Sequence, residues 1–293
     1  MMSVDALQVK AYAKINITLD VLHKRADGYH EVSMIMQAIN LHDTVSLKKQ
    51  NGDITVEANI PALACDDSNL ACRAARLVKE NCHIAEGVHI VLDKQIPLAA
   101  GLAGGSSNAA AVLKGMNQLW QLGLSQAELE ALGASLGSDI PFCLRGGTML
   151  ATGRGEILTP LPAMPCCYVV LAKPGICVST AQVYGRYRSA EQVIHPDTQG
   201  VIAGLERQDL PAVTQRLCNV LESVTVTEYP LIDELKQSMK RYGVMNSLMS
   251  GSGPTVFGLT PDLERANYVA DRLGSQFKDK ADIRVAKTLA RVE

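Results

Sequence analysis

Three residues in this chain could carry proton and phosphate chemistry. Lys14 and Asn16 lie two positions apart in AKINITL, residues 13–19, a run of alternating character. Residues two apart in a strand share a face, so the ammonium and the amide would point together. A solvated strand face is the simpler explanation in isolation. Asp139 lies in GSDIPF, where its carboxylate could accept a proton or cap the turn that begins at Pro141.

A glycine-rich segment over residues 97–107 follows a strand predicted over 88–93 and leads into a helix predicted over 107–122. Without Cβ atoms, such a loop can bring backbone N–H groups against a phosphate, and a helix N-terminus adds roughly half a positive charge. A tight turn with close helix packing would use the same residues. The segment lacks the lysine of a Walker A loop and the G-x-G-x-x-G spacing of a dinucleotide site. It comprises Pro97, Leu98, Ala99, Ala100, Gly101, Leu102, Ala103, Gly104, Gly105, Ser106 and Ser107.

Two shorter segments are weaker signals. SGSGP at residues 250–254 precedes a strand predicted over 255–259, and a rigid loop explains it as well as a ligand loop does. A turn at residues 26–28 is followed by Tyr29 and His30, a ring and an imidazole. A lone histidine is most often structural or merely exposed.

Composition excludes several classes of protein. The 28 basic and 30 acidic residues leave a net charge of -2, without the basic field that nucleic acids or anionic membranes require. Aromatic residues make up 4% of the chain, too few for a broad base-stacking platform. No apolar run approaches the ~20 residues of a membrane helix, and the N-terminal residues lack an apolar signal segment. We therefore expect a soluble, cytoplasmic protein that binds small molecules.

The eight cysteines do not predict a disulfide framework or a zinc site. They are scattered through a chain of 293 residues, and none forms a C-x-x-C pair. We expect buried thiols that pack as small hydrophobic groups in a reducing compartment.

The predicted elements give a mixed fold in two parts. The first part contains a strand over 8–22, a hairpin of 45–48 and 53–58 around Asn51-Gly52, and helices over 70–81 and 125–137 with N-terminal caps. Two prolines in residues 161–167 place a domain boundary near residue 160. The second part is predicted to contain a strand at 167–174, helices at 199–223, 230–242 and 261–275, and strands at 255–259 and 282–287. Alternating helices and strands indicate α+β or α/β structure.

Three of these segments occur in an order that resembles the three motifs of the GHMP kinases. They are residues 13–19, 97–111 and 250–254, and together they span nearly the whole chain. The family phosphorylates small-molecule alcohols and acids with ATP. The resemblance implies an α+β fold of two domains: residues 1–160, similar to the second domain of ribosomal protein S5, and residues 161–293, ferredoxin-like. It places the active site in the cleft between them.

The same resemblance implies roles for the candidate residues. Asp139 would accept the proton of the acceptor hydroxyl, and Lys14 would orient Asp139 and hold charge on the γ-phosphate. Residues 97–107 would bind the phosphates of ATP, with Mg²⁺ bridging them. The metal ligands stay open, with Ser107 as a candidate. Adenine contacts fall at Asn69, Leu70 and Lys94, and the segment closing over the reacting groups is Gly251, Ser252 and Gly253.

The sequence RADGYH at residues 25–30 is similar to one branch of the family. Members of that branch phosphorylate the 2-hydroxyl of diphosphocytidyl-methylerythritol in the non-mevalonate isoprenoid pathway. Asn16, Tyr29 and His30 would then hold this substrate, and Tyr184 falls where an aromatic ring stacks on cytosine. Ala103 replaces a frequent glycine, and backbone contact with ATP would survive if its φ is negative.

Three alternative functions compete with this interpretation. A GHMP kinase for a sugar, homoserine or a mevalonate derivative would not need the turn at residues 25–30. A non-catalytic binding module would not need both Lys14 and Asp139. A dinucleotide-binding protein would need the missing G-x-G-x-x-G fingerprint. The sequence leaves the oligomeric state open between monomer and homodimer.

Overall fold

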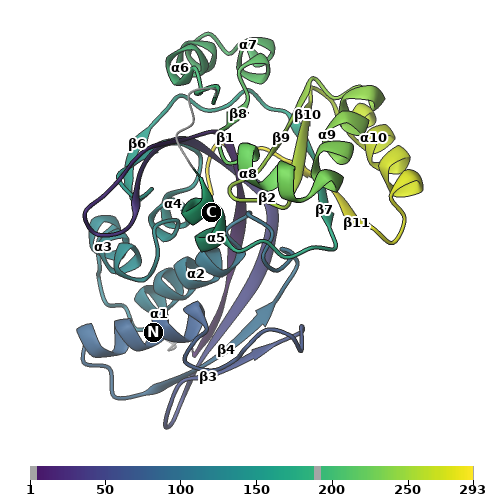
Figure 1. Ribbon diagram of the computed structural model, residues 1–293. Helices are drawn as coiled ribbons and strands as arrows, with labels where there is room; N and C mark the ends of the chain where they lie inside the picture. Colours follow the sequence, from purple (N-terminus) through teal and green to yellow (C-terminus); the bar gives the residue numbers. More distant parts are fainter. Residues whose placement is uncertain (1–4, 188–192, 293) are drawn as a thin grey trace.

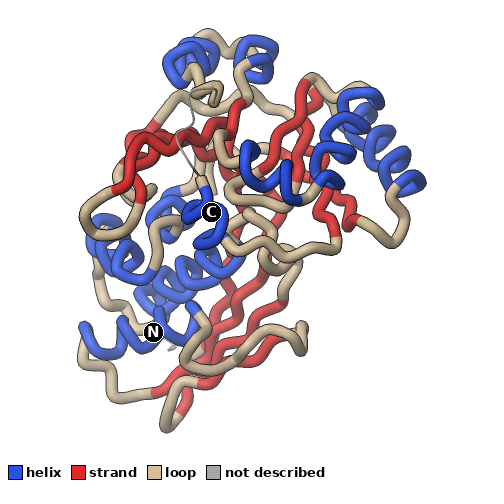
Figure 2. The backbone as a smooth tube through the Cα atoms, in the orientation of Figure 1, coloured by secondary structure: helices blue, strands red, loops and turns tan. Residues whose placement is uncertain are grey.

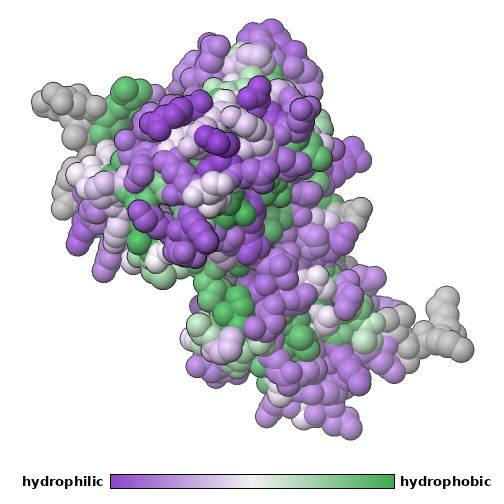
Figure 3. Space-filling view, turned by 90° about the vertical axis from the view of Figure 1, so that its right-hand side faces the viewer, coloured by the Kyte–Doolittle hydropathy of each residue, from purple (hydrophilic) through white to green (hydrophobic). Residues whose placement is uncertain are grey.

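The computed structural model describes residues 5–187 and 193–292, which form two layered units joined side by side. Figure 3 shows the molecule from the side, where it narrows between an upper and a lower lobe. Each unit has one sheet with helices against it, and the mixed α+β class is confirmed (Figure 2). Within the described residues, no helix is long and apolar enough to span a membrane.

The larger sheet has seven strands in the order β3-β4-β2-β1-β8, with β5 paired to β2 and β6 paired to β5. Two long antiparallel strands form its centre. The strands are β1 Ala6–Lys24, β2 His30–Gln50, β3 Thr55–Ala58, β4 Gly87–Asp93, β5 Thr148–Thr152, β6 Ile157–Pro160 and β8 Cys218–Asn219.

The hairpin predicted around Asn51-Gly52 is wrong, although both of its strands exist. β4 lies between β2 and β3, antiparallel to β2 and parallel to β3. Gly87 makes this crossing possible, because a Cβ there would lie 2.4 Å from the carbonyl oxygen of Asp53. The turn therefore carries the chain across the end of β4.

Four helices belong to the larger unit, and two match the sequence closely. They are α1 Leu70–Asn81, α2 Gly104–Leu119, α3 Gln126–Leu136 and α4 Ile140–Arg145. Asn69 caps α1 by accepting a hydrogen bond from the N–H of Ala71 at 2.9 Å. Ser125 and Glu128 form the predicted capping box of α3. α2 begins at Gly104, inside the glycine-rich segment, rather than at Ser107.

The smaller sheet has four antiparallel strands in the order β11-β7-β10-β9. They are β7 Tyr168–Pro174, β9 Asn246–Met249, β10 Val256–Thr260 and β11 Ala281–Lys287, and the long helices α9 Pro230–Tyr242 and α10 Leu263–Gln276 pack against them. Short helices complete the unit: α5 Thr180–Arg186, α6 Thr198–Glu206, α7 Leu210–Gln215 and α8 Glu222–Glu228.

The single helix predicted over residues 199–223 is wrong. Asp197 caps α6 and Asp209 caps α7, each by accepting a backbone N–H three residues on. Pro211 falls in the first turn of α7, where its missing N–H costs nothing. The chain then forms β8, which pairs in parallel with Thr18 and Leu19 of β1 and so adds a strand to the larger sheet.

The expectation of buried thiols is wrong for Cys65, Cys166 and Cys177, which are exposed. Cys72 and Cys167 are buried as expected, and the other three are partly buried. All eight thiols are free.

Candidate functional site

A cavity of about 790 Å³ lies where the two units meet. Its wall combines the central strands, the glycine-rich segment, the start of α4, α5 and the loop before β10. The predicted residues that line it are Lys14, Asn16, Tyr29, His30, Leu70, Lys94, Pro97, Leu98, Ala99, Ala100, Gly101, Ala103, Gly104, Gly105, Ser106, Asp139, Tyr184, Gly251 and Ser252. Asn69, Leu102, Ser107 and Gly253 are not among the lining residues.

Lys14 is the residue at which the separate segments meet. Its ammonium donates hydrogen bonds to Asn16 Oδ1 at 2.7 Å and to the carbonyl oxygen of Gly101 at 3.1 Å. The same nitrogen lies 3.9 Å from Asp139 Oδ2, and a Cβ on Gly251 would lie 3.4 Å from it. Lys14 is 4% exposed and Asn16 is fully buried, so the alternative of a solvated strand face is wrong.

Asp139 precedes α4 but makes no capping hydrogen bond with its side chain. The carboxylate therefore does not act as the helix cap that the sequence allowed. It is 31% exposed, and among the described residues it is the one carboxylate in the cavity wall. Cys143 lies one turn further along α4, where burial, followed by the charge of Asp139, raises the pKa of its thiol.

The glycine-rich segment adopts a left-handed backbone at Ala99, Gly101 and Ala103, with φ of 49°, 72° and 58°. Ala103 does not have the negative φ on which its backbone contact with ATP was made conditional. Ala103 is the N-cap of α2 and has no side chain that can accept a hydrogen bond. The first N–H groups of the helix consequently have no side-chain cap, which suits them to an anion.

The loop before β10 packs directly on the glycine-rich segment. Ser250 donates from Oγ to the carbonyl oxygen of Gly101 at 3.0 Å. A Cβ on Gly101 would lie 2.3 Å from the carbonyl oxygen of Ser250, so this approach requires glycine. Ser252 shares a hydrogen bond of 2.8 Å with the hydroxyl of Thr180 in α5. Two glycine clusters far apart in sequence thus form one continuous wall.

Aromatic and basic side chains line the end of the cavity that lies next to the turn at residues 26–28. The rings of His30 and Tyr184 lie 5.5 Å apart between centroids. Tyr29 is 54% exposed and has the guanidinium of Arg154 4.9 Å from its ring centroid. Burial, with a smaller effect from the charge of Lys24, lowers the pKa of His30 below its usual value of 6.5. Burial, followed by Asp139, raises the pKa of the Tyr184 hydroxyl.

Sequence reasoning missed Lys24 and Arg154, which both line the cavity. Arg154 lies between Gly153 and Gly155, both at positive φ. A charged residue between two glycines was a sequence signal that could have identified Arg154, but nothing in the sequence indicated its contact with Tyr29.

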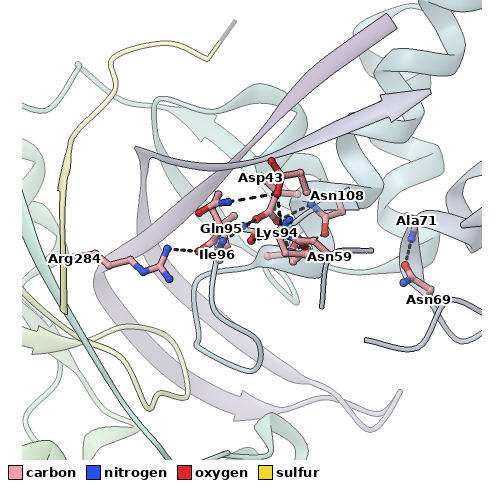
Figure 4. Close-up of polar contacts among 12 residues, drawn as sticks. Asp43, Asn59, Asn69, Ala71, Lys94, Gln95, Ile96, Asn108 and Arg284 are labelled. Carbon is pink, nitrogen blue, oxygen red and sulfur yellow. Dashed lines mark hydrogen bonds and ion pairs between the residues drawn. The ribbon is translucent and has the colours of Figure 1, made fainter. Parts of the chain in front are cut away.

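Three predicted residues use their side chains elsewhere. Asn69 caps α1, and Ser107 is buried and donates to the carbonyl oxygen of Gly104 at 3.0 Å. Lys94 reaches the cavity wall, but its ammonium is paired with the buried Asp43 and hydrogen-bonds to Asn108 (Figure 4). Sequence reasoning also missed Asp43, because 51 residues separate it from Lys94.

The described residues contain no group of three or more His, Cys, Asp or Glu side chains that could hold a metal by themselves. Among the described residues that line the cavity, the oxygen ligands suited to a cation are the carboxylate of Asp139 and hydroxyl groups, which include those of Ser106, Ser138, Thr180 and Ser252. Such a wall suits a cation that phosphate oxygens and water hold in large part, as Mg²⁺ usually is.

Comparison with known proteins gives matches over both units. Residues 69–147 match the family described as GHMP kinases N terminal domain, and residues 201–279 match GHMP kinases C terminal. A protein of Geobacillus kaustophilus named 4-diphosphocytidyl-2-C-methyl-D-erythritol kinase is 54% identical over 91% of this chain and 92% of its own length. Its namesake from Shouchella clausii is 48% identical, with 96% of this chain and 94% of that protein covered.

Two solved structures have the same arrangement of elements. A crystal structure of 4-(cytidine 5'-diphospho)-2C-methyl-D-erythritol kinase is 32% identical, with a TM-score of 0.80 over 96% of this chain and 99% of that one. Homoserine kinase from Cytophaga hutchinsonii is 20% identical, with a TM-score of 0.79 over 100% of this chain and 97% of that one. The second likeness concerns the fold alone.

Proposed function

The chain belongs to the GHMP kinases, a family of ATP-dependent small-molecule kinases, and we propose that it phosphorylates the 2-hydroxyl of 4-diphosphocytidyl-2-C-methyl-D-erythritol. The products would be the 2-phosphate and ADP. The names of the relatives at 48–54% identity support this acceptor. The observation that carries the proposal is the position of the Lys14 ammonium, which contacts the glycine-rich segment and lies 3.9 Å from Asp139.

In the proposed reaction, Asp139 accepts the proton of the acceptor hydroxyl while that oxygen attacks the γ-phosphorus of ATP. The bond from the γ-phosphorus to the bridging β,γ-oxygen breaks, and ADP leaves. Such transfers need positioning and electrostatic stabilisation more than covalent chemistry. The uncapped N-terminus of α2 and the Lys14 ammonium would supply positive charge to the transferred phosphoryl group.

Mg²⁺ is part of the proposal, as an ion that arrives with ATP. The hydroxyl of Ser106 is a group in the wall that would hold it, which leaves the carboxylate of Asp139 to the acceptor hydroxyl. Ser107 is a poorer ligand than expected, because its hydroxyl is buried and bonded to Gly104. When bound, the ion neutralises negative charge on the phosphates.

The acceptor would occupy the end of the cavity near the turn at residues 26–29. His30 and Tyr184 present adjacent rings that suit a cytosine base. Asn16 is hydrogen-bonded to Lys14, so both side chains would contact the same polar groups of the acceptor. Adenine would lie near Leu70, beside the start of α2. Asn69 is proposed there through its backbone only, since its side chain caps α1.

The wider setting belongs to the same proposal. Residues 1–160 and 161–293 would be the two domains, and among the described residues β8 is the one strand of the larger sheet that comes from the second half. The non-mevalonate isoprenoid pathway follows from the acceptor. A cytoplasmic location, the lack of a nucleic-acid partner and the choice between monomer and homodimer stay predictions.

A coupled ADP-release assay tests the proposal directly. The purified chain is given ATP and Mg²⁺ with 4-diphosphocytidyl-methylerythritol, galactose, homoserine or mevalonate in separate reactions. Turnover with the first acceptor alone is the expected result. Turnover with one of the other three would overturn the acceptor assignment and leave the family unchanged.

A further inference from the structure

Asp43 of β2 is fully buried, and its carboxylate joins the two ends of the glycine-rich segment. Oδ1 accepts hydrogen bonds from the backbone N–H groups of Gln95 and Ile96, both at 2.7 Å. Oδ2 accepts one from Asn108 Nδ2 at 2.8 Å and a second from Lys94. Gln95 and Ile96 directly precede the segment, and Asn108 directly follows it in α2. Figure 4 shows these groups converging on the one carboxylate.

Asp43, Lys94 and Asn108 form a closed triangle of side chains. Each is bonded to the other two, since the Lys94 ammonium also donates to Asn108 Oδ1 at 2.8 Å. The opposite charges of Asp43 and Lys94 cancel, so the triangle places little net charge next to residues 97–107. Its contribution to phosphate binding is therefore to hold the segment in position rather than to attract the phosphate.

The segment needs such support because its backbone is costly. Ala99 and Ala103 have positive φ, a conformation that residues with a Cβ adopt only when their surroundings hold them there. The ammonium of Lys94 lies directly beneath the start of α2, since a Cβ on Gly104 would be 3.4 Å from it. The triangle thus contacts the chain on both sides of the strained part, at Gln95 and Ile96 before it and at Gly104 after it.

We infer that Asp43 is a positioning residue that acts through Lys94 and Asn108 to hold residues 97–107 in the conformation that binds the phosphates of ATP. The inference rests on the proposed function, which gives that segment its ligand. Asp43 itself does not line the cavity. Weakening the triangle should therefore lower the affinity for ATP and leave the affinity for the acceptor unchanged.

Asn108→Ala is the decisive variant, because it removes two of the three bonds of the triangle, those to Asp43 and Lys94, and leaves the Asp43–Lys94 ion pair intact. We expect the Kd for ATP, measured by calorimetry without acceptor, to rise about tenfold, as the loss of one or two net hydrogen bonds predicts. The KM for the acceptor should stay within about twofold, a change too small to register against that tenfold effect. Asp43→Asn should raise the Kd for ATP further. If Asp43→Asn does not fold, Asn108→Ala alone tests the inference.

Thr148→Val provides the matched control. Thr148 is 3% exposed in β5 of the same sheet and bonds to Gln37 and Met164, away from the segment. It should lower the melting temperature without changing the Kd for ATP. An unchanged Kd in Asn108→Ala, or an equal rise in Thr148→Val, would overturn the inference.

The two proposals fail in different ways. Wild-type protein that binds ATP but does not turn over the diphosphocytidyl acceptor would contradict the proposed function, while the calorimetric comparison would still decide the role of Asp43. Wild-type protein that does not bind ATP would overturn both.

Discussion

The ammonium of Lys14 lies 3.9 Å from the nearer carboxylate oxygen of Asp139, beyond hydrogen-bond distance. Shorter bonds to Asn16 and to the carbonyl oxygen of Gly101 hold the ammonium away from the carboxylate. The positive charge of Lys14 therefore lies close to Asp139, but no carboxylate oxygen accepts a hydrogen bond from the ammonium. Its oxygens stay available to a substrate hydroxyl, which is the arrangement a general base requires.

Asp139→Asn should lower kcat by about 10²–10⁴-fold, the usual contribution of a general base. The amide is nearly the same size but cannot take the proton. Coupled ADP release measures the loss, and calorimetry should show that ATP still binds. Turnover near the wild-type rate would remove Asp139 from the mechanism.

Lys14→Ala should cut kcat or raise the KM for ATP, because it removes the cation that joins the glycine-rich segment to Asp139. Lys48→Ala, at an exposed position of β2, is the control and should leave both constants unchanged. Circular dichroism and thermal melting accompany the kinetics. A collapsed fold in Lys14→Ala would show that the buried lysine serves the structure instead.

Tyr184→Ala should weaken binding of the cytidine-bearing acceptor by about ten- to a hundredfold, since base stacking on an aromatic ring contributes ~1–3 kcal/mol. The KM for ATP should not change. Tyr184→Phe keeps the ring beside His30 and should behave like the wild type. Equal acceptor affinity in the alanine and wild-type proteins would assign the stacking to another ring.

Gly101→Ala should lower activity, whereas Ala103→Gly should keep or raise the stability of the fold. A methyl group on Gly101 would lie 2.3 Å from the carbonyl oxygen of Ser250, so the two glycine clusters must separate and activity should fall sharply.

Ala103 has φ 58°, a conformation that costs an alanine ~1–2 kcal/mol. Glycine there removes that cost and adds ~0.5–1 kcal/mol of chain entropy to the unfolded state. Chemical denaturation should therefore show a stability between that of the wild type and about 1.5 kcal/mol more. A clear loss of stability in Ala103→Gly would contradict this account.

Local signals in the sequence were sufficient wherever one side chain bonds to its own neighbourhood. Asn69 and the pair Ser125 and Glu128 set the starts of α1 and α3, and both helices have the predicted bounds to within a residue or two. The family's ordered motifs likewise brought Lys14, Gly101 and Gly251 to one cavity.

Long-range pairing was beyond reach of the sequence. The Asn51-Gly52 turn looks the same whether the next strand returns to β2 or crosses to the far side of β4. Nothing near Lys94 indicates that its partner is Asp43, and nothing near Ala103 indicates a positive φ. These features depend on where the sheet places distant residues.

The two-residue strand β8 limits how the molecule can move. Cys218 and Asn219 pair with Thr18 and Leu19 of β1, and the side chain of Asn219 donates to the carbonyl oxygens of Met249 and Gly251. A wide swing of one unit away from the other would have to break that pairing. A polypeptide cut after residue 160 would therefore lose the short strand that pairs with Thr18 and Leu19 at the edge of the larger sheet.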